Sequence, residues 1–255
     1  MVMPLYDDNT GRTITPVVNY LLIAANVLVF VFLQGGGTNE RFTYAYSAVP
    51  EEIRTGKDIY GPVPIDSPTT GEQHELPLER TPIPVYLTLL TSIFMHGSWA
   101  HLLGNMLFLW IFGDNIEDSL GHGRYLIYYL LCGLLASLAH VWSVFAFDGN
   151  PMIPSLGASG AISGVLGGYI LLHPNRRVMV ILLRIVTWVP AYVAVGMWFA
   201  LQLISGLADL GSKMGGVAYG AHIGGFIAGL VLIKPFTIGR TPDEVERPVG
   251  RWVRR

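Results

Sequence analysis

The sequence predicts an all-α membrane protein built as a bundle of six transmembrane helices. Of its 255 residues, 51% are hydrophobic and only 13% are charged, about half the charged fraction of a typical soluble domain. The mean hydropathy is +0.47. The apolar residues are also gathered into blocks of roughly 17 to 25 residues, the length that crosses a bilayer as a helix.

Composition also narrows the classes of function. The net charge of -2 provides no basic surface for nucleic acid, so no nucleic-acid partner is expected. Cys132 is the only cysteine and lies inside an apolar block, which excludes a disulfide or a cysteine metal cluster within one chain. The first residues carry Asp7, Asp8 and only Arg12 as a base, so they are a poor signal peptide and the first apolar block is expected to remain as a span.

Six blocks are predicted to span the membrane. The second continues past Asp114 with a helical pattern, and the fifth contains Pro190, a predicted kink site. The six blocks are residues 17–33, 99–113, 125–147, 152–172, 185–208 and 214–233.

Three segments follow from this pattern: an N-terminal segment over residues 1–16, a membrane domain over 17–233 and a basic tail over 234–255. The membrane domain includes a long loop, residues 35–95, that begins rich in Gly, Pro and charge. Its last part, residues 83–95, is apolar but too short to span. This length is typical of an interfacial or re-entrant segment.

The basic residues predict the orientation. The fourth loop carries Arg176 and Arg177, the tail carries Lys234 and five arginines, and the third loop, residues 148–151, has no basic residue. By the positive-inside rule, the tail and the fourth loop are cytoplasmic. With six spans the N-terminus is then also cytoplasmic, and the long first loop faces outside.

Four polar residues are expected at one depth in the membrane. Spans two, four and six run in the same direction, and near their starts they carry His101 with Asn105, Ser159, and His222. Ser159 alone is explained by helix packing, and His222 alone by a bond to a backbone carbonyl. An ionisable residue within a membrane is nevertheless costly and indicates function. As a pair, His222 can accept the Ser159 hydroxyl proton during attack and return it to the leaving amine.

Two glycine faces are predicted to bring this pair together. Small residues let membrane helices approach closely. Span four carries Gly160, Gly164 and Gly168 at four-residue spacing, and span six carries Gly220 with Gly224 and Gly225 with Gly229. Contact between these faces would place Ser159 and His222 within hydrogen-bond reach.

His101 and Asn105 are four residues apart and therefore share a helix face. They are interpreted either as interhelical hydrogen-bonding groups or, with the Ser159 backbone N–H, as donors to an oxyanion. His96, five residues before His101, is interpreted first as a structural residue bonding loop backbone and second as an oxyanion donor.

A metal site is not predicted. A membrane metalloprotease would carry H-E-x-x-H, and His74-Glu75 lacks the second histidine. Asp114, Glu117 and Asp118 lie at the opposite end of span two from His101. The sequence therefore predicts neither a metal nor any other cofactor.

Four motifs in this order resemble those of the rhomboid intramembrane serine proteases, and they cover residues 85–233. The motifs are His96-x4-His101-x3-Asn105, Gly113-x3-Glu117-x3-Gly121, Gly157-Ala158-Ser159-Gly160 and Ala221-His222-x2-Gly225-x3-Gly229.

The resemblance implies a six-transmembrane-helix rhomboid-like bundle of the bacterial form, with a first loop partly embedded in the outer leaflet. It implies a Ser–His dyad without an aspartate, in which Ser159 is the nucleophile, His222 the general base, and His101 with Asn105 the oxyanion hole. Supporting residues at matching motif positions are His96, Gly157, Gly160 and Gly225.

The family also implies the partners: the lipid bilayer, and single-span membrane proteins cut in or near their transmembrane segment at small residues. The expected location is the bacterial cytoplasmic (inner) membrane, as a multi-pass protein. Two positions depart from the family pattern. Leu87-Thr88 stands where Trp-Arg is common, and Ser163 stands where an aromatic residue often stacks on the catalytic histidine.

Two alternatives come from other classes of function. The first is a non-catalytic rhomboid-like binder or chaperone of transmembrane clients. The second is a small transporter or proton path that uses the intramembrane histidines. A transporter of this kind is expected to carry inverted repeats and broken helices, and the two halves of the sequence show no convincing repeat.

Overall fold

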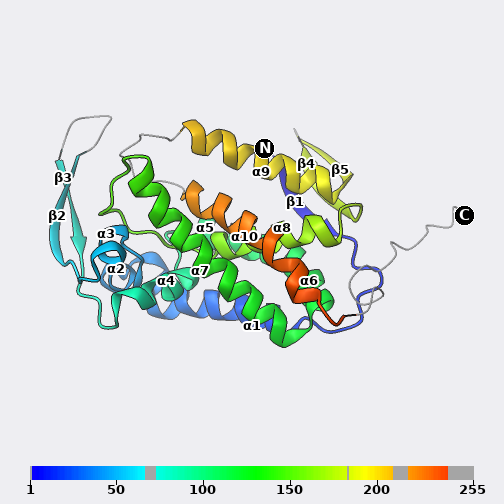
Figure 1. The fold of residues 1–255 in the computed structure, drawn as a ribbon, viewed down its shortest axis with the longest axis horizontal. Helices are drawn as coiled ribbons and strands as arrows, with labels where there is room; N and C mark the ends of the chain where they lie inside the picture. Colours follow the sequence, from blue (N-terminus) through cyan, green and yellow to red (C-terminus); the bar gives the residue numbers. More distant parts are fainter. Residues whose placement is uncertain (1, 67–72, 183, 209–217, 241–255) are drawn as a thin grey trace, which may run out of the picture.

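A computed structural model of the chain describes residues 2–66, 73–182, 184–208 and 218–240. It shows an elongated, helix-rich molecule (Figure 1). Within this part of the chain, three helices are long and apolar enough to cross a membrane: α7 (His122–Ala146), α9 (Ala191–Ala208) and α10 (Tyr219–Thr237). How many helices cross the membrane stays a prediction.

The shorter apolar helices lie where spans one, two and four were predicted. Helix α1 (Val17–Leu28) continues as a π-helix to Leu33, so residues 17–33 are helical throughout. Helix α5 (Trp99–Phe108) continues through a π-helical turn into α6 (Asp114–Leu120). The predicted fourth span began at residue 152, whereas α8 (Ser159–Leu172) begins seven residues later.

Helix α8 is the centre of the bundle. Every residue from Gly160 to Tyr169 is buried, as expected for a helix that is apolar on all sides. In Figure 1, α8 lies among α5, α7 and α10. Residues on these elements, among them Leu102, Tyr128 and Phe226, form the main hydrophobic core with it.

The chain is not all-α, because residues 177–190 form a β-hairpin. Strand β4 (Arg177–Leu182) pairs antiparallel with β5 (Ile185–Pro190), and Arg184 in the connection has φ +80°. The predicted fifth span began at residue 185, but its first six residues are strand and α9 begins at 191. The run is rich in Val and Ile and includes Thr and Trp, residue types that favour strands. Pro190 ends the strand and does not kink a helix.

The N-terminal segment belongs to the same fold. Strand β1 (Val2–Asp7) pairs antiparallel with β4, giving a three-stranded sheet of order β1-β4-β5. The sheet packs against the bundle, because Val178 and Val180 of β4 are fully buried. Pro4 and Val180 share a small cavity with Phe108 of α5 and Trp198 of α9.

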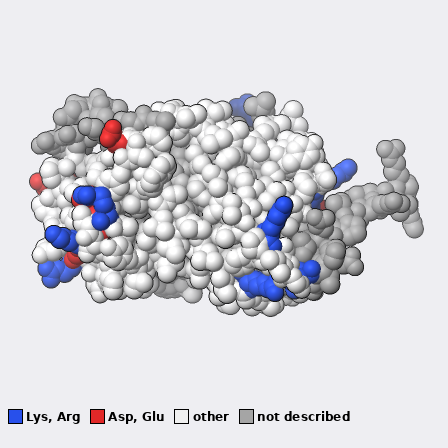
Figure 2. All heavy atoms as spheres, viewed as in Figure 1, with Lys and Arg blue, Asp and Glu red and all other residues white. Residues whose placement is uncertain are grey.

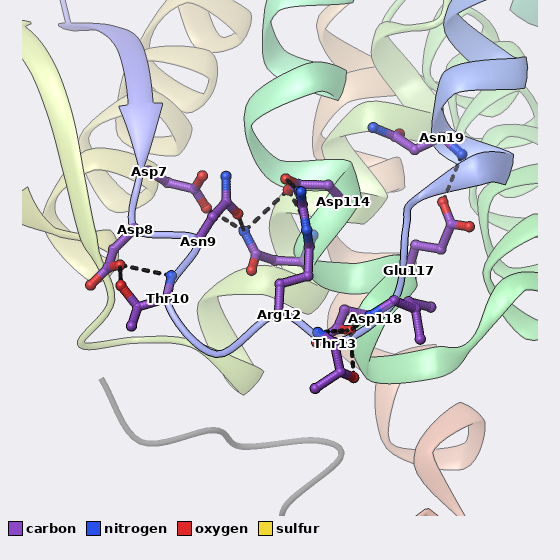
Figure 3. Close-up of polar contacts among 12 residues, drawn as sticks. Asp7, Asp8, Asn9, Thr10, Arg12, Thr13, Asn19, Asp114, Glu117 and Asp118 are labelled. Atoms are coloured by element: carbon purple, nitrogen blue, oxygen red, sulfur yellow. Dashed lines mark hydrogen bonds and ion pairs between the residues drawn. The ribbon is translucent and has the colours of Figure 1, made fainter. Parts of the chain in front are cut away.

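The chain that follows β1 is bonded to α6 (Figure 3). Arg12 forms an ion pair with Asp114. The backbone N–H groups of Thr13 and Ile14 both donate to Asp118 Oδ1 over 2.9 Å. These contacts join residues about one hundred positions apart in the sequence.

Glu117 of α6 then caps the first turn of α1. The N–H groups of Val18 and Asn19 donate to its two carboxylate oxygens over 2.9 and 2.7 Å. The first N–H groups of a helix have no intrahelical acceptor, and the N-terminus favours negative charge. A buried carboxylate on a neighbouring helix therefore satisfies the start of α1.

The long first loop has its own secondary structure, which the sequence analysis left undefined. Its predicted short apolar segment is a series of helical turns over residues 85–94. Within the loop, β2 (Gly61–Asp66) and β3 (Gln73–Leu78) pair as a hairpin, which projects from one end of the molecule (Figure 1). The elements before the apolar segment are a 3-10 turn (Gly35–Gly37), α2 (Glu40–Tyr46), α3 (Pro50–Thr55), β2 (Gly61–Asp66) and β3 (Gln73–Leu78).

The surface agrees with a membrane protein. Figure 2 shows Lys, Arg, Asp and Glu gathered toward the two ends of the long axis, with an uncharged region between them on this face. Apolar side chains on the helices are exposed, including Leu21, Trp110 and Val231 at 63%, 56% and 66%. Exposed apolar patches of this kind mark a membrane or partner surface. The predicted start of span six at Met214 and tail residues 241–255 lie outside the described residues.

Candidate active site

Glycines bring α8 and α10 into backbone contact. The carbonyl oxygen of Gly160 faces Gly225, and that of Gly164 faces Gly229, too closely for a side chain at either α10 position. Gly160 also abuts Ala136 of α7, where an added Cβ would lie 2.7 Å from the alanine Cβ. The predicted close approach of spans four and six is therefore present.

This packing places Ser159 beside His222. Ser159 is the first residue of α8, and His222 lies in the first turn of α10. The distance between Nε2 of His222 and Oγ of Ser159 is 2.7 Å, a normal hydrogen-bond length. Both residues are half-buried. The serine hydroxyl and the imidazole are thus in the relative position that proton transfer requires.

The other ring nitrogen of His222 has a partner that the sequence analysis missed. Nδ1 lies 2.6 Å from Oε1 of Gln202 on α9. The ring of Trp198, also on α9, has its centroid 6.1 Å from the His222 ring at an interplanar angle of 38°. Gln202 is the only amide side chain in the predicted fifth span, residues 185–208, which has no charged residue. This isolated amide was the signal available in the sequence.

Ser163 stands where an aromatic support was expected. It is fully buried, and its hydroxyl donates to the Ser159 carbonyl over 2.6 Å. This is a bond within α8, one turn apart. Ser163 therefore contacts the backbone of Ser159, while Trp198 and Gln202 contact His222.

His101 lies near the serine, with Gly157 between them. Ser98 caps α5 by accepting from the His101 N–H over 3.1 Å, which places His101 in the first turn. The Gly97 N–H donates to Nδ1 of His101 over 3.4 Å. A neutral imidazole carries one proton, so this contact favours protonation of Nε2. A Cβ at Gly157 would lie 2.9 Å from that Nε2 and 3.6 Å from Ser159 Oγ.

Gly157 is therefore needed for two reasons. Its φ of +129° is disfavoured for other residues, and a side chain there would collide with the His101 ring. Asn105, one turn after His101, is 8% exposed. Its Nδ2 donor is buried and has no hydrogen-bond partner among the described residues.

His96 lies behind His101. The rings are 5.1 Å apart at an angle of 69°. The Gln34 side chain accepts from the His96 backbone N–H and donates to its carbonyl, both over 2.9 Å. The expectation was that the His96 ring would bond loop backbone. That expectation stays a prediction, and the structure adds a buried side chain, Gln34, that bonds the His96 main chain and thereby fixes the loop before α5.

A small cavity adjoins Ser159. Small side chains and hydroxyl groups line it, among them Ser92, Ser137, Ser155 and Ala136. Among the residues that the structure describes, no group of three or more His, Cys, Asp or Glu side chains is arranged to hold a metal ion. The described polar groups near Ser159 include its hydroxyl, imidazoles and the two amides of Gln202 and Asn105.

The class of protein follows from this fold and site together with a family match. The model of the rhomboid domain matches residues 84–237, which is more than half of the chain. The chain belongs to the rhomboid family and is a membrane protein.

Three relatives in the family are about equally similar to the chain. The chain is 31% identical over 213 residues to Rhomboid protease GluP of Bacillus subtilis, covering 82% of this chain and 35% of the relative. It is 30% identical over 156 residues to the mitochondrial Rhomboid protein 1 of Saccharomyces cerevisiae (60% and 43%). It is also 30% identical over 156 residues to the chloroplastic Rhomboid-like protein 11 of Arabidopsis thaliana (59% and 52%). The chain thus spans between 35% and 52% of the length of these relatives.

Proposed function

We propose that the chain is an intramembrane serine endopeptidase that cleaves single-span membrane proteins in or near their transmembrane segment. The observation that carries the proposal is the 2.7 Å contact between His222 Nε2 and Ser159 Oγ. It joins two polar residues 63 positions apart, each at the start of an apolar helix. The family match and the relative named a rhomboid protease support the same conclusion.

In the proposed mechanism, Ser159 Oγ attacks the carbonyl carbon of the scissile bond while its proton passes to Nε2 of His222. The resulting imidazolium then donates this proton to the leaving amine, and an acyl-enzyme forms. Water completes the cycle by attacking the ester, with His222 again acting as the general base.

The proposed oxyanion hole consists of His101, Asn105 and the Ser159 backbone N–H. The Asn105 amide supplies a buried donor that no described residue uses. The Gly97 contact to His101 Nδ1 favours an Nε2–H directed toward Gly157 and Ser159. As Ser159 begins α8, its N–H has no intrahelical acceptor. Donors fixed in advance around a developing negative charge are a major source of rate acceleration.

The proposed substrate class follows from the surroundings of Ser159. The adjoining cavity is small and is lined mostly by Ser, Gly and Ala, and its limited volume supports cleavage after or near small side chains. The exposed apolar side chains of the helices support a site surrounded by lipid, where transmembrane segments are available as substrates. We place the protein in the bacterial cytoplasmic (inner) membrane with both termini cytoplasmic, as the basic loops and the Bacillus subtilis relative support.

The test is cleavage of a panel of single-span reporter proteins in proteoliposomes. Wild type is expected to release a fragment cut within or beside the transmembrane segment, and Ser159→Ala and His222→Ala are each expected to abolish it. Ser143→Ala is the matched control, because among the described residues the Ser143 hydroxyl bonds the His140 carbonyl of its own helix. Undiminished cleavage by both site variants would disprove the proposal. Stable binding of the reporter without cleavage would instead support a non-catalytic client-binding protein.

A further inference from the structure

Helix α9 adds a third polar group to Ser159 and His222. We propose that Gln202 is a positioning residue whose amide oxygen holds His222 in the tautomer that can act as a base. The three residues then form an uncharged Ser159–His222–Gln202 triad. The inference rests on the proposed function, since it assigns a role in the same reaction.

The tautomer follows from the two contacts of the imidazole. A neutral histidine has one N–H, on either Nδ1 or Nε2. In the amide orientation that the structure has, Oε1 of Gln202 lies 2.6 Å from Nδ1 and can only accept, so in this arrangement Nδ1 is the donor. Nε2 is then left with a free lone pair, directed at the Ser159 hydroxyl 2.7 Å away. The opposite tautomer would place an N–H toward Ser159 and could not remove its proton.

The same task is performed by the carboxylate in Ser-His-Asp enzymes, which fixes the tautomer and orientation of the histidine. Cys-His-Asn enzymes use an amide in that place. An amide suits the present site because a carboxylate within the membrane is costly. The titratable side chains that interact electrostatically with His222 are two further histidines, His101 of α5 and His140 of α7. Gln202 thus provides an acceptor without burying a negative charge.

Trp198 supplies a second restraint from the same helix. It lies four residues before Gln202 and therefore on the same face of α9. Its ring approaches the His222 ring at 6.1 Å while also contacting Phe108 at 6.2 Å and Phe226 at 6.5 Å. The Trp198 ring lies beside the imidazole, and the Gln202 amide bonds its Nδ1 edge. Together they restrict rotation of the His222 side chain about χ1 and χ2. Together they replace the aromatic residue absent at position 163.

The placement of α9 against α10 is specified by packing. The fully buried residues of α9 are Ala191, Ala194 and Val195 in its first two turns, next to the β1-β4-β5 sheet. Further along, Phe199 stacks on Phe226 of α10 with ring centroids 4.0 Å apart. Figure 1 shows α9 along one edge of the bundle. The aromatic contact and the buried first turns together hold Gln202 at His222.

The experiment compares the full chain with Gln202→Leu, Gln202→Glu and the control Ile204→Ala, whose side chain is 64% exposed on α9. Two quantities are measured against pH in detergent: the rate at which a fluorophosphonate labels Ser159, and kcat and KM for a cleaved single-span reporter. Gln202→Leu is expected to lower kcat and the labelling rate by about tenfold or more with little change in KM, within the roughly 10⁴-fold loss seen when a triad histidine takes the wrong tautomer.

Gln202→Glu distinguishes positioning from simple packing. A carboxylate still accepts from Nδ1, so most of the activity lost in Gln202→Leu should return. It also favours the imidazolium, so the acidic limb of the pH–rate profile should move to higher pH. Ile204→Ala should match wild type in both respects. If Gln202→Leu does not fold, the shift in Gln202→Glu still decides the matter.

Two results would overturn the inference while leaving the proposed function intact: wild-type rates in Gln202→Leu, or equal losses in both Gln202 variants with an unmoved pH profile. Absence of labelling and cleavage in wild type itself would reject the proposed function, and the inference with it.

Discussion

The carbonyl oxygen of Gly160 on α8 faces the Cα of Gly225 on α10 with no space for a side chain between them. This contact lies one residue from Ser159 and three from His222. The distance between Ser159 and His222 therefore depends on the absence of two side chains. The same two glycines thus set both the packing of α8 on α10 and the distance between the Ser159 and His222 side chains.

Gly225→Ala is expected to separate α8 from α10. The added methyl group would overlap the Gly160 carbonyl, and overpacking of this kind costs about 1–3 kcal/mol. Thermal unfolding in detergent should show the loss, and reporter cleavage should fall further than the stability change explains. Gly196→Ala on α9 is the control, because a Cβ there meets no atom of the described residues within 4 Å. Equal behaviour of the two variants would contradict the proposed role of the contact.

Asn105→Ala is expected to lower kcat by about 10²–10³-fold, the usual cost of one lost oxyanion donor. KM should change little, because the charge on the oxygen develops only in the transition state. Asn115→Ala, on the distant α6, offers an asparagine outside the site as a comparison. A normal kcat for Asn105→Ala in steady-state cleavage of the reporter would remove Asn105 from the oxyanion hole.

Glu117→Ala is expected to destabilise the start of α1. The change leaves the N–H groups of Val18 and Asn19 without their acceptors, at a cost of about 1–3 kcal/mol for a buried polar group that loses its partner. Amide hydrogen exchange should increase in the first turn of α1. Glu79→Ala, which removes a 40%-exposed side chain in the first loop, should leave that turn protected. Unchanged exchange in Glu117→Ala would show that the cap is dispensable.

Asp7 is expected to make stability depend on pH. Burial, followed by the nearby Asp114, raises the pKa of its carboxyl from 3.8 to about 8. The folded chain then keeps a proton that the unfolded chain releases, so this contribution is complete below pH about 4 and is lost as the pH rises toward 8. Asp7→Asn cannot release a proton. Its melting temperature relative to wild type should therefore rise from pH 5 to pH 8.

Asp8→Asn provides the comparison for this measurement, because Asp8 bonds Thr10 at the surface beside the same strand. Its melting temperature relative to wild type should not follow that pH trend. A pH-independent difference between Asp7→Asn and wild type would show that Asp7 is ionised in the folded protein.

Hydropathy and helix direction were sufficient to predict much of the bundle and of the site. Apolar block length located the helices at residues 17–33 and 125–147 closely. The shared direction of spans two, four and six predicted that Ser159 and His222 would lie at one depth. The glycine spacing predicted how their helices would meet. These inferences rest on the length of a helix that crosses a membrane and on the four-residue spacing of small residues along one helix face.

The parts that were missed depend on contacts between distant segments. Residues 185–190 are apolar enough to be read as the start of a helix, and they are strand because they pair with β4, which in turn pairs with β1. In the first loop, signals for local structure were present, since Asn39 caps α2 and Gly56 ends α3 with φ +68°, but they do not specify how these helices pack. Gln202 is an isolated amide until α9 is placed against α10. Its role depends on the fold and cannot be read from its neighbours in the sequence.

The most direct test of the account is the site of labelling by a fluorophosphonate, mapped by mass spectrometry on the membrane-embedded protein. The account predicts a covalent adduct on Ser159 that disappears in His222→Ala, because the hydroxyl then lacks its base. Ser163, four residues away in the same helix, should remain unlabelled. An adduct on another serine, or labelling of Ser159 that persists undiminished in His222→Ala, would contradict the central claim that these two residues form a catalytic dyad.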